Sequence, residues 1–117
     1  MPPIHPQPDI LDQVWVDCIA ACSECYETCE KMIFQHCLKL GGRHAGQAHL
    51  TLMADCAQIC RTAANFMIRG STRHLLTCGI CAAICEACAD DCGRLGEMDE
   101  CVRACRQCAD SCRAMVS

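Results

Sequence analysis

The sequence predicts an all-α fold: an antiparallel up-down four-helix bundle with a cysteine-lined core. Cysteines recur at alternating spacings of three and four residues, and at about 100° per residue this alternation keeps the thiols on one face of a helix. Four successive segments carry such a stripe. The connections between them are short, which favours antiparallel neighbours. The four stripes are therefore expected to face one central axis.

The composition agrees with one small helical domain. The chain has 117 residues, a formal charge of -4, 3% aromatic residues and 16 cysteines. Because cysteine packs like a small apolar residue, these cysteines can take core positions that leucine usually fills. All four prolines lie in the first eight residues. Residues 1–9 are therefore expected to be a flexible, proline-rich segment, and residues 10–117 a single four-helix bundle domain.

The first helix is expected from about Ile10, capped by Asp9, to about Leu40, where two glycines follow. Cys37 falls about a quarter-turn off the stripe of this helix, because it follows Cys29 by eight residues rather than seven. The stripe itself comprises Cys18, Cys22, Cys25 and Cys29, continued by Met32 and His36.

Three further helices follow. The second is expected from about Gly46 to Arg69, the third from a cap at Ser71 or Thr72 to near Gly96, and the fourth from near Asp99. The second stripe consists of His49, Met53, Cys56, Cys60, Ala63 and Met67. The third consists of His74, Cys78, Cys81, Cys85, Cys88 and Cys92, and the fourth of Cys101, Cys105, Cys108, Cys112 and Met115.

Several classes of protein are disfavoured. The N-terminus has neither a basic start nor an apolar run, so it does not resemble a signal peptide and a cytoplasmic location is expected. Thiols in the cytoplasm are kept reduced, and a disulfide scaffold would be rich in loops, whereas this sequence is patterned for helices. No apolar run approaches the length of a membrane span, and the mildly acidic balance does not favour nucleic acid.

Metal binding is the chemistry that the thiol stripes favour. Iron–sulfur clusters usually come with loop-borne cysteine runs ending in Cys-Pro, and no proline follows these cysteines. Zinc prefers isolated sites of four ligands, and several thiolate-rich zinc sites in one narrow core would accumulate negative charge. Cu(I) is soft and accepts two or three sulfurs, so each ion cancels one thiolate charge. We therefore expect storage of multiple Cu(I) ions without catalysis, with an iron–sulfur (ferredoxin-like) redox protein or a thiolate zinc buffer as alternatives.

The candidate ligands are all sixteen cysteines together with His36, His49, Met53 and His74. In an antiparallel bundle, one end gathers Met32, His36, Cys37, His49, Met53 and Met98, and the other end gathers Met67, His74 and Met115 near Trp15. Thioether and imidazole bind Cu(I) more weakly than thiolate, which suits loading or exchange. The methionines are equally well explained as core packing. His5 and His44 are expected to be exposed and without a role.

Over about residues 10 to 116 the chain resembles the bacterial copper storage proteins, and more closely their cytosolic branch. The resemblance rests on Cys56-Ala-Gln-Ile-Cys60, Cys81-Ala-Ala-Ile-Cys85-Glu-Ala-Cys88 and Cys101-Val-Arg-Ala-Cys105-Arg-Gln-Cys108. It implies a four-helix bundle that holds many Cu(I) ions by core thiolates, protects against copper toxicity and assembles as a homotetramer. A copper chaperone or exporter would then exchange copper with it. The second helix departs from this pattern, because it carries two thiols and has Ala63 on its stripe.

Overall fold

The computed structural model describes residues 10–116, with side chains from residue 13 onward, and shows the predicted bundle. Its helices are α1 (Ile10–Met32), a π-helical turn (Ile33–Cys37), α2 (Leu38–Leu40), a 3₁₀ turn (Gly42–Ala45), α3 (Gln47–Ile68), α4 (His74–Leu95) and α5 (Asp99–Val116). The prediction for residues 1–9, including the Asp9 cap, lies outside the described residues.

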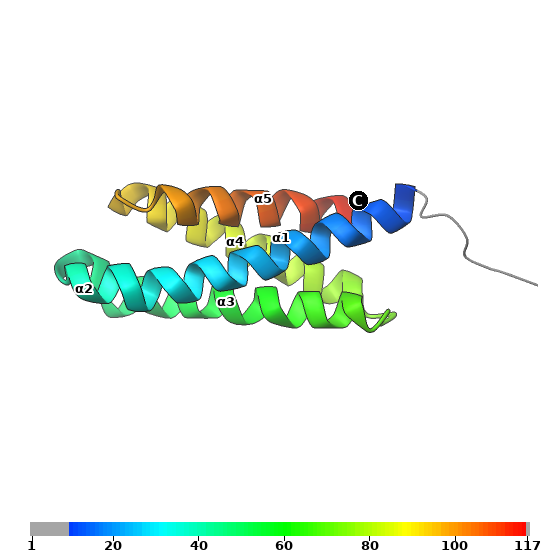
Figure 1. Ribbon diagram of the computed structural model, residues 1–117, viewed down its shortest axis with the longest axis horizontal. Helices are drawn as coiled ribbons and strands as arrows, with labels where there is room; N and C mark the ends of the chain where they lie inside the picture. Colours follow the sequence, from blue (N-terminus) through cyan, green and yellow to red (C-terminus); the bar gives the residue numbers. More distant parts are fainter. Residues whose placement is uncertain (1–9, 117) are drawn as a thin grey trace, which may run out of the picture.

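The long helices run up and down in chain order (Figure 1). Helix α1 packs on α3 and α5, and α4 packs on the same two helices, so the ring order is α1, α3, α4, α5. Each long helix is antiparallel to both of its neighbours in this ring. Short connections favour this arrangement between helices that follow one another in the chain. The fold class predicted from the sequence is confirmed. At 1.5 Å per residue, the 22 residues of α3 give a core about 33 Å long.

The core is lined with small side chains. Every one of the sixteen cysteines has an exposed fraction of 0%, and alanines such as Ala63, Ala82 and Ala89 fill the remaining core positions at 0%. The long apolar side chains that are fully buried, Met53 and Met98, both lie against Cys37. The interior is therefore lined with sulfur along its length, as the stripes predict.

Cys37 is buried in this core, and the prediction that it falls off the stripe of the first helix is wrong. The reason is the π-helical turn Ile33–Cys37, in which the backbone N–H of Leu38 bonds to the carbonyl of Ile33. Such a turn holds one residue more than an α-helical turn. Because the turn holds this extra residue, Cys37 lies on the same face as Cys29 although eight residues separate them, and its side chain reaches the axis.

Two glycines and one turn mark the helix boundaries. Gly41 (φ 68°) ends α2 and Gly96 (φ 83°) ends α4, both in the left-handed region that suits glycine. Neither predicted cap, Ser71 or Thr72, occupies the N-cap of α4; that position is Arg73, whose backbone N–H donates to the Ser71 hydroxyl at 3.1 Å. Among the helices of residues 10–116, none is long and apolar enough to cross a membrane.

Candidate metal centre

All four long helices deliver sulfur atoms to the bundle axis. The contacts cross all four interfaces. Cys60 lies 3.4 Å from Cys85 between α3 and α4, and Cys108 lies 3.5 Å from Cys22 between α5 and α1. Cys25 lies 3.9 Å from Cys56 between α1 and α3, and Cys92 lies 3.6 Å from Cys101 between α4 and α5. All sixteen cysteines are free thiols. The site is thus a continuous column of reduced sulfur rather than a disulfide framework.

The column contains groups of four cysteines whose sulfurs all lie within 4.8 Å of one another. We number five of these groups so that each shares cysteines with the next. They are group one (Cys22, Cys81, Cys108, Cys112), group two (Cys60, Cys81, Cys85, Cys108), group three (Cys25, Cys56, Cys60, Cys85), group four (Cys25, Cys29, Cys56, Cys105) and group five (Cys29, Cys88, Cys101, Cys105). Because the donors are thiols alone, these groups suit soft thiophilic ions and not Mg²⁺ or Ca²⁺.

Burial favours the protonated form of the thiol of Cys37, which lies outside these five groups. The pKa of Cys37 rises to about 11, first because burial disfavours the thiolate, and then because Cys101 and Cys88 would add like charge nearby. The thiolate is the metal-binding form. Binding a metal ion at Cys37 therefore releases a proton.

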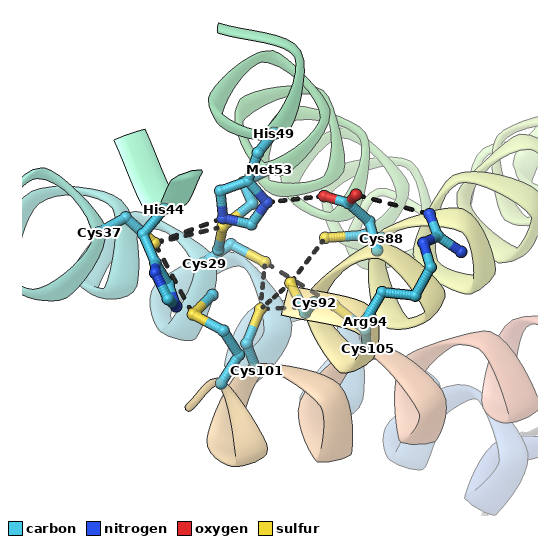
Figure 2. A network of polar contacts seen from close by, with 12 residues as sticks. Cys29, Cys37, His44, His49, Met53, Cys88, Cys92, Arg94, Cys101 and Cys105 are labelled. Atoms are coloured by element: carbon cyan, nitrogen blue, oxygen red, sulfur yellow. Dashed lines mark hydrogen bonds and ion pairs between the residues drawn. The ribbon is translucent and has the colours of Figure 1, made fainter. Parts of the chain in front are cut away.

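At the end of the bundle where the π-helical turn lies, the thiol of Cys37 is in contact with one imidazole and two thioethers (Figure 2). Its sulfur lies 3.4 Å from Nε2 of His49, 3.9 Å from Sδ of Met53 and 3.7 Å from Sδ of Met98. These four side chains, which we call the Cys37 cluster, come from three segments: the π-helical turn, α3 and the connection between α4 and α5. Two of the predicted ligands, His49 and Met53, are thus brought together with a cysteine.

Asp91, which was not among the predicted site residues, fixes the ring of His49. Its Oδ2 lies 2.7 Å from Nδ1 of His49, and its Oδ1 lies 3.5 Å from the guanidinium of Arg94. A carboxylate accepts, so Nδ1 carries the proton and Nε2 presents its lone pair toward Cys37. Carboxylates commonly orient metal-binding histidines in this way. Spacing did not reveal Asp91, because it lies 42 residues from His49 in the sequence.

His36 and His44 brace the connection between α4 and α5. Nε2 of His36 lies 2.8 Å from the carbonyl of Glu97, and Nε2 of His44 lies 2.9 Å from the carbonyl of Gly96. The prediction that His44 is exposed is therefore wrong, because its side chain is half-buried and hydrogen-bonded; that it has no functional role stays a prediction. The corresponding prediction for His5 lies outside the described residues.

At the opposite end of the column lies an aromatic contact. The ring of His74 packs on Trp15 with centroids 4.3 Å apart, and its Nδ1 lies 2.9 Å from the carbonyl of Ser71. Beneath it, the thiol of Cys78 donates to Sδ of Met67 at 3.8 Å. The predicted ligand His74 is therefore close to the column but engaged with Trp15 and Ser71.

A four-helix bundle with a free-thiol column along its whole core defines a class of protein built to bind thiophilic metal ions. Comparison with known families identifies which one. Residues 12–117 match the family described as Csp, copper storage protein. The chain belongs to this family, as the motifs in its sequence suggested.

Solved structures and a curated relative agree. The Nmul_A1745 protein of Nitrosospira multiformis superposes with a TM-score of 0.88 at 51% identity, covering 90% of this chain and 96% of that one. The Cu(I)-bound copper storage protein BsCsp3 superposes with a TM-score of 0.83 at 34% identity, covering 90% and 100%. The uncharacterized cysteine-rich protein YhjQ of Bacillus subtilis is 34% identical over 109 residues, which span 92% of this chain and 100% of that one.

Proposed function

We propose that this protein stores multiple Cu(I) ions on the thiolates of its core and has no catalytic reaction. The observation that carries the proposal is the set of overlapping four-cysteine groups, which are equivalent in chemistry and repeat along the column. A catalyst needs one distinct reactive position, whereas a store needs many similar ones. The Cu(I)-bound structure of BsCsp3 supports this assignment.

Charge favours Cu(I) over zinc in this core. A zinc ion held by four thiolates leaves a net charge of about -2, and buried charge without compensation is costly. Within the described core, the residues around the sulfurs are mainly alanine and methionine, which offer no compensating cation. Each Cu(I) cancels one thiolate, so a core loaded with roughly one ion per thiol is nearly neutral.

The biological setting completes the proposal. Storage of this kind would buffer copper in the cytoplasm and protect against its toxicity, with a copper chaperone or exporter exchanging ions with the bundle. A homotetramer is expected by resemblance to the family. Val16 (57% exposed) and Phe34 (60% exposed) are apolar side chains on the outside of the bundle and are the candidates for subunit contacts.

Anaerobic titration of the reduced protein with Cu(I) against a competing chelator tests storage. Binding of roughly one ion per thiol is the expected result, because each thiolate can bridge two ions and each ion takes two or three sulfurs. Saturation at one or two ions per chain would contradict it. A brown colour in the protein as isolated would instead favour the iron–sulfur alternative, since Cu(I) thiolates absorb in the ultraviolet.

We further propose that copper is loaded through the Cys37 cluster. All sixteen cysteines, and with them His36, His49, Met53 and His74, were predicted as ligands; among the four added residues, the contacts favour His49 and Met53. Their weaker donor atoms lie against a thiol, and Asp91 orients the ring of His49. Weak ligands at the end of a thiolate column suit exchange with a donor.

Replacing His49 tests the loading end. His49→Ala is expected to slow the initial uptake of limiting Cu(I) about tenfold, in line with the effect of losing an oriented ligand, while lowering the total capacity by about one ion. His74→Ala, the matched histidine at the opposite end, is expected to leave the initial rate unchanged. Stopped-flow ultraviolet absorbance measures both. Equal slowing in the two variants would rule out the Cys37 cluster as the preferred loading end.

A further inference from the structure

Successive four-cysteine groups in the core share pairs of cysteines. Groups one and two share Cys81 and Cys108, groups two and three Cys60 and Cys85, groups three and four Cys25 and Cys56, and groups four and five Cys29 and Cys105. Each shared pair is in contact, with sulfur–sulfur distances of 3.8, 3.4, 3.9 and 3.9 Å in that order.

The four shared pairs also sit at four different helix interfaces. In the same order they join α4 with α5, α3 with α4, α1 with α3, and α1 with α5. The series therefore winds once around the bundle as it advances along the axis. Each shared pair takes its two thiols from two different helices, and the four pairs together use all four long helices. The path therefore depends on the complete bundle.

We propose that this series is a track along which Cu(I) passes from group to group, each time keeping the two thiolates of the shared pair. The inference rests on the proposed copper storage and adds a route by which a buried column is filled from one end. Two sulfurs satisfy Cu(I), so the ion keeps its minimum coordination during each transfer. An ion without ligands in such a core would face a desolvation cost of order 20 kcal/mol.

Each transfer is balanced in bonds, protons and charge. As copper enters the next group, it keeps its bonds to the shared pair, while its third bond, to one sulfur behind that pair, breaks and a bond to one sulfur ahead forms. One thiol ahead loses a proton and the thiolate left behind gains one, and a sulfur of the shared pair lies in contact with both sides. Between groups four and three, the shared Cys56 lies 3.8 Å from Cys105 behind and 3.6 Å from Cys85 ahead. Copper remains Cu(I), and the core keeps its net charge.

The track reaches both ends of the column. Group five connects to Cys92, whose sulfur lies 3.6 Å from Cys101 and 4.0 Å from Cys88, on the side of the Cys37 cluster (Figure 2). Group one connects to Cys18, whose sulfur lies 3.8 Å from that of Cys112. Trp15 packs against the core at this far end and is the single tryptophan of the chain. Its fluorescence therefore reports when copper arrives there.

Two variants that each lack two thiols separate the track from mere capacity. Cys60→Ala/Cys85→Ala removes one shared pair completely, whereas Cys29→Ala/Cys60→Ala leaves one thiol in each of the two pairs it touches. After mixing with Cu(I), ultraviolet absorbance follows total uptake and Trp15 emission follows arrival at the far end. We expect a lag between the two signals in the unmodified protein. The lag should lengthen at least tenfold in the first variant and less than threefold in the second.

Several controls keep the result interpretable. Cys60→Ser/Cys85→Ser replaces the first variant if loss of the thiols disturbs folding, because a hydroxyl preserves volume but binds Cu(I) poorly. Amide NMR signals of Cys78 and Cys112 provide a second measure of arrival at the far end. An absent lag, or equal lags in the two double variants, would overturn the track. Either outcome would leave storage standing as long as the final absorbance still corresponds to many ions, whereas a small final absorbance would count against storage itself.

Discussion

Filling the core with Cu(I) is expected to raise the melting temperature of this protein by more than about 20 °C. Metal that binds the folded state alone stabilises it by mass action, and a single structural metal site contributes about 10–16 kcal/mol of binding free energy in small domains. In a domain of roughly 100 residues, each kcal/mol shifts the melting temperature by about 4 °C or more. Several ions that join four helices should therefore exceed the stated shift easily.

The metal-free core explains why the effect should be so large. Its buried side chains are mainly cysteine and alanine, and each buries less apolar area than leucine would. Burial stabilises by about 25 cal/mol per Å², so this interior contributes less than an ordinary bundle core of the same length. Thiolate–copper bonds across the helix interfaces would supply the missing cohesion.

Circular dichroism melts of the reduced protein with and without Cu(I) provide the measurement. Removal of the copper with a strong Cu(I) chelator should return the melting temperature to that of the metal-free protein, which controls for irreversible changes. A copper-loaded protein that melts within a few degrees of the metal-free one would show that the ions do not join the helices. The proposed sites in the core would then be wrong.

The sequence was sufficient to predict the fold and most of the candidate site, because both follow from helical periodicity. Fifteen of the sixteen cysteines lie on stripes in steps of three and four, and that pattern has one geometric solution, an inward face. The antiparallel order followed from the short connections.

Features that depend on backbone irregularity or on distant residues could not be read from periodicity. Cys37 appeared to lie off the stripe, because nothing in its neighbours indicates a π-helical turn. Asp91 lies one position before Cys92 on α4, where a carboxylate next to a core residue looks like an ordinary surface charge. Its role became visible once α3 and α4 were packed and His49 lay 2.7 Å away.

Deleting Gln35 is expected to leave the bundle and its sixteen buried thiols intact, whereas deleting Gln58 is expected to abolish cooperative folding. Both residues are exposed glutamines within helical segments, so the two deletions are closely matched. Gln35 lies in the π-helical turn, which holds one residue more than an α-helical turn needs. Its removal converts the segment to an α-helix and places Cys37 seven residues after Cys29, in line with the stripe.

Gln58 lies in regular α-helix, where no extra residue is available. Its deletion rotates the following part of α3 by about 100° relative to the preceding part, so Cys60, Ala63 and Met67 leave the core together. Urea denaturation measures the free energy of unfolding, and Cu(I) titration measures the number of ions bound. Deletion of Gln35 should lower the free energy of unfolding by less than about 2 kcal/mol, in the range of ordinary substitutions. If the two deletions were equally damaging, the π-helical turn would not be the device that brings Cys37 to the axis. It would instead be required for another reason, such as positioning His36 and His44 against the connection between α4 and α5.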